Sequence, residues 1–507
     1  METFKKINNA VVLGVAAILL GLAHNFLFFE KSPGINFFLF AALILAIGWA
    51  VNLKFGRSVE KQKLVLFLPI LFFSFMIFVR SSELLAFFNA VASVLLFFIL
   101  ARSCEGKPVS DFLPEDYAKI FFLPFKFIAP FWKTLSEIFI ELFAIRKIAK
   151  NHPHAREIAR GTLMSLVALL AFTLLFSQAD ESFNNFVQSI VSFNWRIDEE
   201  VFGRIILFVL VSSFFIGAFG YAFGKREENA GAPEEKTRNA GALEMKIFLG
   251  SINVLFFIFI ILQLEHLFGG GGSVLSEGIT YAAYARKGFY ELMLAAILSY
   301  AIIATAENQI AKNGNSHFRS FKLLSAALIV QTVAILFSAF MRLSLYENAY
   351  GFSTIRLYSH ALMIWVGVVL FLLMRHILGG GTRTKFAMQV FVCVILLLFS
   401  MNLINPDAFI AKRNLERYEL TGRIDAAYLA NLSDDAIPYT AKLLDDPDET
   451  VRSNFAKELY PSLRHRTKAT EEGWQSFQIS RARAQKILSP KEAYIKTIWE
   501  FGTVTII

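Results

Sequence analysis

Eleven runs of mostly apolar residues, each long enough to cross a lipid bilayer, recur along the chain. The hydrocarbon core of a bilayer is about 30 Å thick and requires about 20 such residues in helical form. Backbone polar groups find no partners in lipid, so each run is expected to be an α-helix. The runs cover residues 9–29, 34–53, 62–79, 82–101, 161–177, 201–223, 245–268, 288–306, 321–341, 354–376 and 385–403. They predict an all-α, polytopic transmembrane helical bundle of about 11 spans with a small helical C-terminal domain.

The composition supports this prediction and excludes other classes of protein. Only 18% of the residues are charged and 55% are hydrophobic, whereas a soluble domain carries about 25% charge. A soluble enzyme is therefore excluded, and the two cysteines, Cys104 and Cys393, cannot form a disulfide framework. The net charge of +9 is attributed to membrane topology, and no nucleic-acid partner is expected.

The spacing of the runs divides the chain into six segments. The expected segments are helices 1–4 in 1–101, a basic cytoplasmic segment in 102–160, helices 5–6 in 161–223, a flexible cytoplasmic linker in 224–244, helices 7–11 in 245–403 and the small extramembrane domain in 404–507. The linker reads KREENAGAPEEKTRNAGA over 225–242, which has no apolar periodicity.

The distribution of charge predicts the orientation in the membrane. Lys and Arg outnumber Asp and Glu in the segments that share the side of the N-terminus, and acids outnumber bases in the loops on the other side. Cytoplasmic loops are the ones enriched in Lys and Arg. We therefore expect a cytoplasmic N-terminus and, after eleven spans, an extracytoplasmic C-terminal domain. One miscounted span would reverse the second expectation.

The basic segment contains a predicted amphipathic helix that lies in the plane of the membrane. Apolar residues recur at helical spacing after Pro130, from Phe131 to Phe143. Arg146, Lys147, Lys150, Arg156 and Arg160 follow. These bases either bind anionic lipid headgroups or only enforce the topology.

Residues that usually carry catalysis or bind metals are scarce. The chain has no nucleophile elbow, zincin motif or P-loop. No catalytic residue, metal ligand or cofactor is therefore assigned. The ionisable residues within or near the runs are His24, Glu265, His266, Glu307 and His360. His24 and His360 either bond to a neighbouring helix or carry protons.

The richest cluster of polar and aromatic residues is expected at the outer membrane interface. We hypothesise that six residues of this cluster bind a ligand: Arg342, Arg356, Tyr281, Tyr284, Tyr346 and Tyr350. Gly351 is expected to end the helix that carries the last two tyrosines, and Ser353 to cap the next helix. Arginine with tyrosines can bind a carboxylate, a phosphate or a lipid head. The alternative is an aromatic belt with snorkelling arginines.

The tail is the only sizeable aqueous region, and part of it predicts a helical hairpin. Ile437, Ala441, Leu443 and Leu444 form one short apolar face, and residues 445–449 form a turn. Val451, Phe455 and Leu459 then recur at helical spacing. Leu444, Val451 and Phe455 are expected to be core residues of this hairpin.

Three stretches resemble an uncharacterised bacterial membrane family, the domain of unknown function 4153/4173 type. They read TYAAYARKGFYEL, MRLSLYENAYGFSTIRLY and NPDAFIAKRNLERYELTGRIDAAYLANLSDDAIP, and they lie in order between Tyr281 and about Leu444. The family favours Leu-Thr where this chain has Phe352-Ser353. The resemblance implies a polytopic protein of the bacterial inner membrane and carries over no catalytic residue.

These observations favour a non-enzymatic membrane sensor or scaffold. Its outer domain would contact an anionic lipid or an envelope protein. The lipid bilayer would surround its membrane-spanning helices. The alternative is a transporter or flippase for a small anionic or lipid-like substrate, with the outer cluster as its entry site. A membrane enzyme is the third class, and no acid–base pair supports it.

Overall fold

The computed structural model of the chain is helical throughout the residues that it describes. These residues are 2–56, 61–104, 107–128, 130–131, 133–135, 138, 199–223, 242–268, 289–310, 318–471 and 473–504. The membrane region contains α1 (Glu2–Phe28), α2 (Ile35–Lys54), α3 (Lys61–Val65), α4 (Phe67–Val79), α5 (Glu83–Ser103), α6 (Pro114–Ile120), the 3-10 turn η2 (Leu123–Phe127), α11 (Glu199–Phe223), α12 (Ala242–Phe268), α15 (Phe289–Ile310), α16 (Phe318–Tyr350), α17 (Thr354–Gly379) and α18 (Arg383–Ile404).

Seven of the described helices are long and apolar enough to cross a membrane. They are α1, α2, α5, α11, α16, α17 and α18. The chain is therefore a multi-pass membrane protein, although eleven spans are not shown. The predicted runs 245–268 and 288–306 form α12 and α15, while 161–177, most of the in-plane helix and the linker lie outside the described residues.

The predicted run 62–79 forms two helices instead of one. The two helices are separated at Leu66, although its backbone angles stay in the right-handed helical region, and α4 has only 13 residues. Pro69 lies in the first turn of α4. Proline has no N–H group, and its ring clashes with the carbonyl four residues earlier, so the helix cannot continue unbroken through this point. Hydrophobicity alone did not reveal this break.

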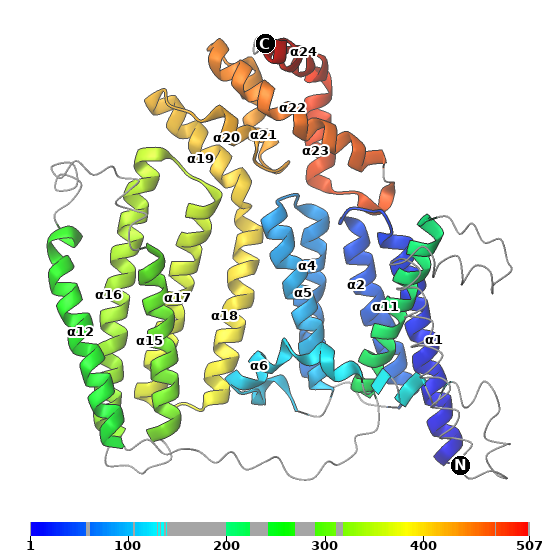
Figure 1. Ribbon diagram of the computed structural model, residues 1–507, viewed down its shortest axis with the longest axis vertical. Helices are drawn as coiled ribbons and strands as arrows, with labels where there is room; N and C mark the ends of the chain where they lie inside the picture. Colours follow the sequence, from blue (N-terminus) through cyan, green and yellow to red (C-terminus); the bar gives the residue numbers. More distant parts are fainter. Residues whose placement is uncertain are drawn as a thin grey trace, which may run out of the picture.

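The helices stand side by side, and the C-terminal domain covers one end of the bundle (Figure 1). We call this the domain end. The start of α1 lies at the other end (Figure 1). Helix α1 packs on α11, and α2 on α4; α16 packs on α12, α15 and α17. Helix α18 joins these two groups because it contacts α17 on one side and α4 and α5 on the other.

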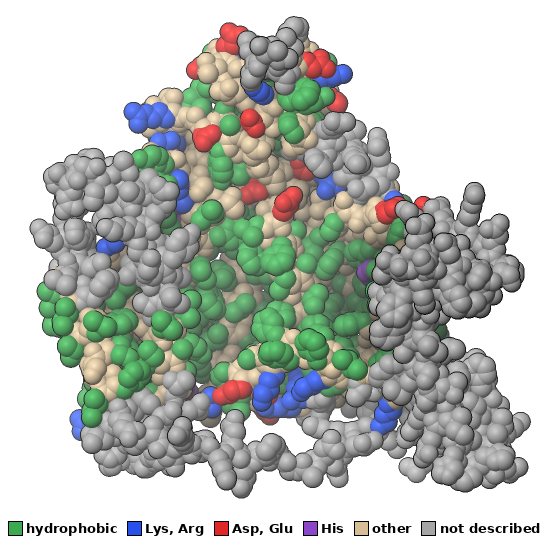
Figure 2. Space-filling view, viewed as in Figure 1, with side chains coloured by type: hydrophobic (Ala, Val, Ile, Leu, Met, Phe, Trp, Pro, Cys, Tyr) green, Lys and Arg blue, Asp and Glu red, His purple; other side chains and the backbone are tan. Residues whose placement is uncertain are grey.

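Basic side chains gather at the end opposite the C-terminal domain, which we call the basic end (Figure 2). The described Lys and Arg residues at this end include Lys54, Lys63, Arg102, Lys107, Lys119, Lys126, Arg319, Lys322, Arg375, Arg383 and Lys385. The surface between the two ends is largely apolar (Figure 2), as a lipid-facing surface should be.

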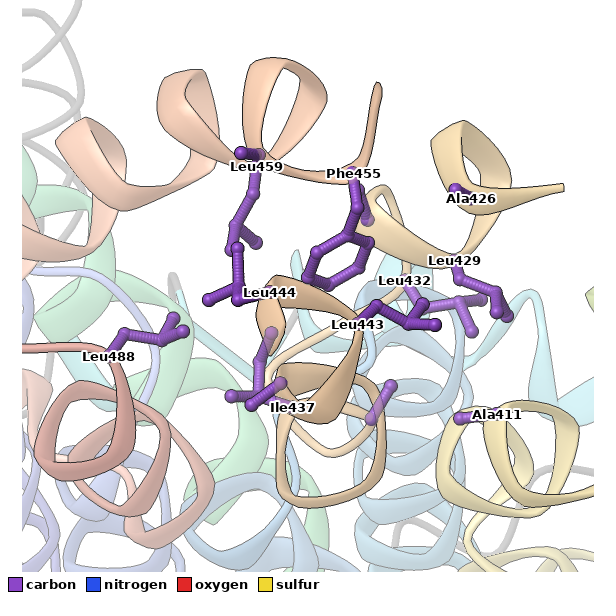
Figure 3. Packing of buried hydrophobic residues seen from close by; sticks show 14 of the residues in the cluster. Ala411, Ala426, Leu429, Leu432, Ile437, Leu443, Leu444, Phe455, Leu459 and Leu488 are labelled. Carbon is purple, nitrogen blue, oxygen red and sulfur yellow. The ribbon is translucent and has the colours of Figure 1, made fainter. Parts of the chain in front are cut away.

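The C-terminal domain is built from short helices around its own core. It contains α19 (Pro406–Thr421), α20 (Ala426–Ala430), α21 (Ile437–Thr440), the 3-10 turn η4 (Ala441–Asp445), α22 (Glu449–Glu471), the 3-10 turn η5 (Trp474–Ser476), α23 (Ile479–Leu488) and α24 (Glu492–Val504). The predicted hairpin is present as α21, η4 and α22. Leu444 and Phe455 point into the core (Figure 3), and Val451 packs partly buried against it.

A buried carboxylate fixes this domain to the bundle. The side chain of Asp435 is 1% exposed and forms an ion pair with Arg80, at 3.4 Å between Nη1 and Oδ1. The backbone N–H of Ser81 donates to Oδ2 at 2.9 Å. The amide of Asn405 and the hydroxyl of Ser480 donate to Oδ1 at 3.3 and 2.6 Å. The donors come from the α4–α5 turn, the end of α18 and α23, so one carboxylate joins three parts of the chain.

A pair of asparagines continues this network into the membrane region. Asn89 of α5 and Asn402 of α18 are both fully buried, and their amides exchange two hydrogen bonds of 2.8 and 2.7 Å. Arg80 also donates to the Asn402 carbonyl at 3.0 Å. Buried amides in helices are costly unless they are paired, so these bonds set the register of α5 against α18.

Truncation of the domain core should unfold the domain. We expect Phe455→Ala to lower the free energy of unfolding by about 3–5 kcal/mol, because Phe455 is fully buried and its removal leaves a cavity. Hydrogen exchange of α22 in the full chain, measured in detergent, checks this. Leu420→Ala is the control, because Leu420 is 86% exposed. Equal exchange in both variants would contradict the assigned core.

Protonation of a second buried acid should stabilise the junction. Burial raises the pKa of Asp407, and the charge of Asp435 raises it further, while hydrogen bonds from Ser433 and Ser82 act in the opposite direction. Just above the ordinary aspartate pKa, the folded chain therefore holds a proton that the unfolded chain has released. The free energy of unfolding should fall as the pH rises through this interval.

Asp407→Asn should remove that pH dependence and leave the protein at least as stable as the wild type at neutral pH. Thermal unfolding of the full chain between about pH 4 and pH 7 measures it. Glu458→Gln, at an exposed carboxylate, is the control. A wild-type stability that rises with pH relative to Asp407→Asn would refute the assigned shift.

Candidate site at the domain end of the bundle

The turn between α16 and α17 carries the candidate site. Helix α16 has 33 residues and is about 50 Å long, so it extends beyond the hydrocarbon core. Gly351 ends it with a φ of +81°, and its N–H donates to the Glu347 carbonyl at 2.7 Å. A Cβ atom at Gly351 would lie 2.3 Å from Oδ1 of Asn414. Both the backbone angle and the close approach require glycine here.

Three of the predicted site residues lie together at this turn. The guanidinium of Arg356 lies 3.9 Å from the centroid of the Tyr346 ring, a cation–π contact. Arg356 also donates to the Gly351 carbonyl. The rings of Tyr346 and Tyr350 meet edge to face at 5.1 Å. Within the described part of the chain, Arg356 has no carboxylate partner.

A histidine and a glutamate lie beneath these residues. Nδ1 of His360 lies 3.2 Å from Oε1 of Glu347, and its Nε2 lies 3.2 Å from Oγ of Ser344. The Ser344 hydroxyl donates to the Phe340 carbonyl at 2.9 Å, so it accepts from Nε2. His360 therefore contacts two polar side chains of the neighbouring helix α16, and Glu347 is its carboxylate partner.

The C-terminal domain holds the same turn from the other side. Asn414 of α19 accepts from the Phe352 N–H at 2.9 Å and donates to the Phe352 carbonyl at 2.8 Å. Arg417 donates to the Ala349 carbonyl at 2.7 Å. The Gly351 turn is therefore flanked by one arginine from α17 and one from α19. Sequence reasoning missed Asn414 and Arg417, and the only signal was their position in the third family-like stretch.

The other predicted site residues have different outcomes. Arg342 lies on α16 one helical turn before Tyr346 and is partly buried. Tyr281 and Tyr284 lie outside the described residues. The expected cap is wrong: Ser353 occupies the N-cap position but makes no capping hydrogen bond. The hydroxyl of Tyr428 accepts from the Thr354 N–H at 2.8 Å instead, because α20 packs close to the start of α17.

The site suits the recognition of an anion by a cation and aromatic rings. Among the described residues, no group of three His, Cys, Asp or Glu side chains could hold a metal ion. The charged groups that border the turn are Arg356, Arg417 and the Glu347–His360 pair. A guanidinium can bind a carboxylate or phosphate through two parallel hydrogen bonds.

Comparison with known proteins identifies the family. The family model described as a domain of unknown function, DUF4153, matches residues 67–443. The chain belongs to the DUF4153 family. No curated protein and no solved structure matches it.

The match confirms the resemblance to this family and extends it toward the N-terminus. The three stretches that resemble the family begin at Tyr281, but the DUF4153 match already begins at α4. It therefore includes Arg80, Asn89 and Asn402 of the junction, together with Asp435 and the turn at Gly351. Most of the junction therefore belongs to the DUF4153 match, although Ser480, which donates to Asp435, lies beyond it.

The turn should not tolerate a side chain at its centre. Gly351→Ala is expected to lower the free energy of unfolding by at least about 1–2 kcal/mol, the cost of the left-handed conformation alone. The contact with Asn414 adds to this cost. Thermal unfolding in detergent measures it. Gly379→Ala, in open space at the end of α17, should be neutral, and equal melting of the two variants would refute the strained turn.

Proposed function

We propose that this DUF4153 protein is a non-enzymatic membrane sensor or scaffold that recognises an anionic group on the outer face of the inner membrane. The basic end would face the cytoplasm, and the C-terminal domain would lie in the extracytoplasmic space. The anionic group would be a lipid head or an acidic group of an envelope protein. Arg356, Tyr346 and Tyr350 would contact it, with Arg342, Tyr281 and Tyr284 completing the site.

Two observations support this orientation. The start of α1 and the C-terminal domain lie at opposite ends of the bundle (Figure 1). The Lys and Arg band lies at the end where α1 starts (Figure 2), and positive residues favour the cytoplasmic side. The described residues include the start of α1 and the C-terminal domain. The inference that they lie on opposite sides of the membrane therefore does not depend on the number of spans.

A reporter that fluoresces only in the cytoplasm should therefore be dark when fused after Ile507. Fused within the linker 225–242, it should be bright. A bright C-terminal fusion would reverse the orientation and place the candidate site in the cytoplasm.

One observation carries the sensing function: the Gly351 turn is held by the membrane helix and by the C-terminal domain at the same time. Arg356 of α17 donates to the Gly351 carbonyl, and Arg417 of α19 donates to the Ala349 carbonyl. An anion that draws Arg356 away from its carbonyl would change the turn that Asn414 and Arg417 hold. Binding would thus be coupled to the position of α19.

Binding at Arg356 should require the guanidinium group. We expect wild-type protein in detergent to bind glycerol phosphate, the soluble head of an anionic phospholipid. Arg356→Lys and Arg356→Ala should each weaken binding at least about tenfold, because lysine cannot reproduce the bidentate fork. Titration calorimetry measures the dissociation constants.

The matched control changes an exposed arginine of α19. Arg413 pairs with Glu416 at 2.9 Å, so Arg413→Lys and Arg413→Ala should bind as the wild type does. Wild-type affinity in Arg356→Lys would instead support an aromatic belt with a snorkelling arginine.

A transporter is the second candidate, favoured by a buried pair at the basic end. Nε2 of His376 lies 2.7 Å from Oε1 of Glu307, and the His376 side chain is 4% exposed. Helix α17 thus carries two histidines about 24 Å apart along its axis, each paired with a glutamate of a neighbouring helix, Glu347 of α16 and Glu307 of α15. Ionisable groups within membranes often serve proton transfer. Proton-dependent uptake of a phosphate ester into proteoliposomes, lost in Glu307→Gln, would establish transport.

A further inference from the structure

A large apolar cavity lies on the side of the bundle away from the Gly351 turn. Its volume is about 770 Å³, within the range of about 300–1,000 Å³ that ligand sites occupy. Helices α1, α2, α5 and α11 form its walls, and η2 contributes Phe127. The lining is dominated by phenylalanine and aliphatic side chains.

The cavity is long and runs along the spans. On α2 its lining extends from Phe37, near the domain end, to Asn52, near the basic end. The distance from Phe37 to Asn52 along the helix is about 22 Å, most of the thickness of the hydrocarbon core. On α11 the lining extends from Leu210 to Phe223 at the basic end. The shape suits an extended chain better than a compact ligand.

The walls between the ends offer little for a polar ligand. The Ser93 hydroxyl donates to the Asn89 carbonyl at 2.8 Å and is therefore engaged. The ring of His24 stacks on Phe28 at 4.8 Å and meets the edge of Phe40 at 5.2 Å, and its buried Nδ1 makes no hydrogen bond to the described residues. A hydrocarbon chain fits this lining.

The basic end of the cavity lies beside a group of cations. Lys63 and Asn52 belong to the lining itself. Lys126 directly precedes Phe127, which also lines the cavity. Partial burial lowers the pKa of the Lys126 ammonium, and the nearby charges of Arg102 and Lys119 lower it further, while the charge of Asp116 acts in the opposite direction. Crowded cations of this kind are stabilised by a bound anion.

We propose that this cavity binds one acyl chain of an anionic phospholipid, drawn from the leaflet at the basic end. The phosphate of the headgroup would lie beside Lys63, Arg102 and Lys126, and the chain would extend along α2 toward Phe37. The site is independent of the proposed anion recognition at Arg356, which lies at the other end of the bundle.

Glycine 48 allows the cavity to be filled selectively. Gly48 lies on the cavity wall in α2, and a Cβ atom there would meet no atom within 4 Å. Gly48→Trp should therefore place its side chain in the cavity without a backbone clash. Gly250→Trp is the matched control, because Gly250 lies within α12 in equally open space and does not line the cavity.

The test uses the full chain in vesicles that contain phosphatidylglycerol with a photoreactive group in one acyl chain. We expect labelling of α2 and α11 in the wild type and in Gly250→Trp, and labelling at background in Gly48→Trp. Unchanged labelling in Gly48→Trp would overturn the proposal. If Gly48→Trp does not fold, competition by unlabelled phosphatidylglycerol in the wild type decides, and labelling that resists competition overturns the site.

The headgroup is tested with the same photoreactive chain on phosphatidylcholine, which has no net charge. Wild-type protein should label less with it. Lys126→Gln should reduce labelling by phosphatidylglycerol about fivefold, the effect of about 1 kcal/mol per basic residue at a membrane surface. Lys385→Gln, at the same end on α18, should not. Equal labelling by the two lipids would overturn the anionic part of the proposal.

Discussion

The burial of the Asp435 carboxylate is the interaction on which the arrangement of this molecule depends. A charge removed from water is tolerated only when it is paired and accepts several hydrogen bonds. Asp435 meets this condition only when Arg80, Asn405 and Ser480 converge on it. The α4–α5 turn, the end of α18 and α23 must then occupy one relative position. The C-terminal domain therefore has one fixed position against the bundle and is not tethered to it by a flexible linker.

The Gly351 turn gives the domain a second attachment, and the two attachments differ in character. At Asp435 the charges are neutralised and enclosed. At the turn, Arg356 is satisfied by a carbonyl group and an aromatic face, and it meets no carboxylate among the described residues. A cation held in this way can still gain from an anion, because a carbonyl group compensates only part of its charge. This difference distinguishes a structural ion pair from a candidate recognition site in the same domain.

The two ends of the bundle present positive charge in different settings. At the basic end, Lys63 lines an apolar cavity that follows the spans, and Lys126 is next in sequence to the lining residue Phe127. This arrangement suits a lipid with both a head and a chain. At the domain end, Arg356 and Arg417 each donate to a backbone carbonyl of the Gly351 turn. The chemistry at one end therefore favours a whole phospholipid, and that at the other favours an anionic group alone.

The sequence by itself determined that the chain is a helical, multi-pass membrane protein of the DUF4153 type. Long apolar runs predict helices, because the backbone N–H and C=O groups of a helix form their hydrogen bonds within the run itself. The hairpin at Leu444 and Phe455 was equally readable, since residues three and four apart share one face. The proximity of Arg356 to Tyr346 was predictable because a short turn joins their helices.

Only the tertiary structure decided which distant groups meet. Asp435 and Arg80 are separated by 355 residues, and Asn89 and Asn402 by 313. Periodicity carries no information over such separations, because it reports which face of a helix is apolar and not which helix lies opposite. Packing between elements also determines the hydrogen bonds that Asn414 and Arg417 make to the Gly351 turn. It likewise determines the pairing of Glu347 with His360. The apolar runs of the sequence therefore predict where helices occur along the chain. Buried polar pairs in the tertiary structure fix how those helices pack against one another.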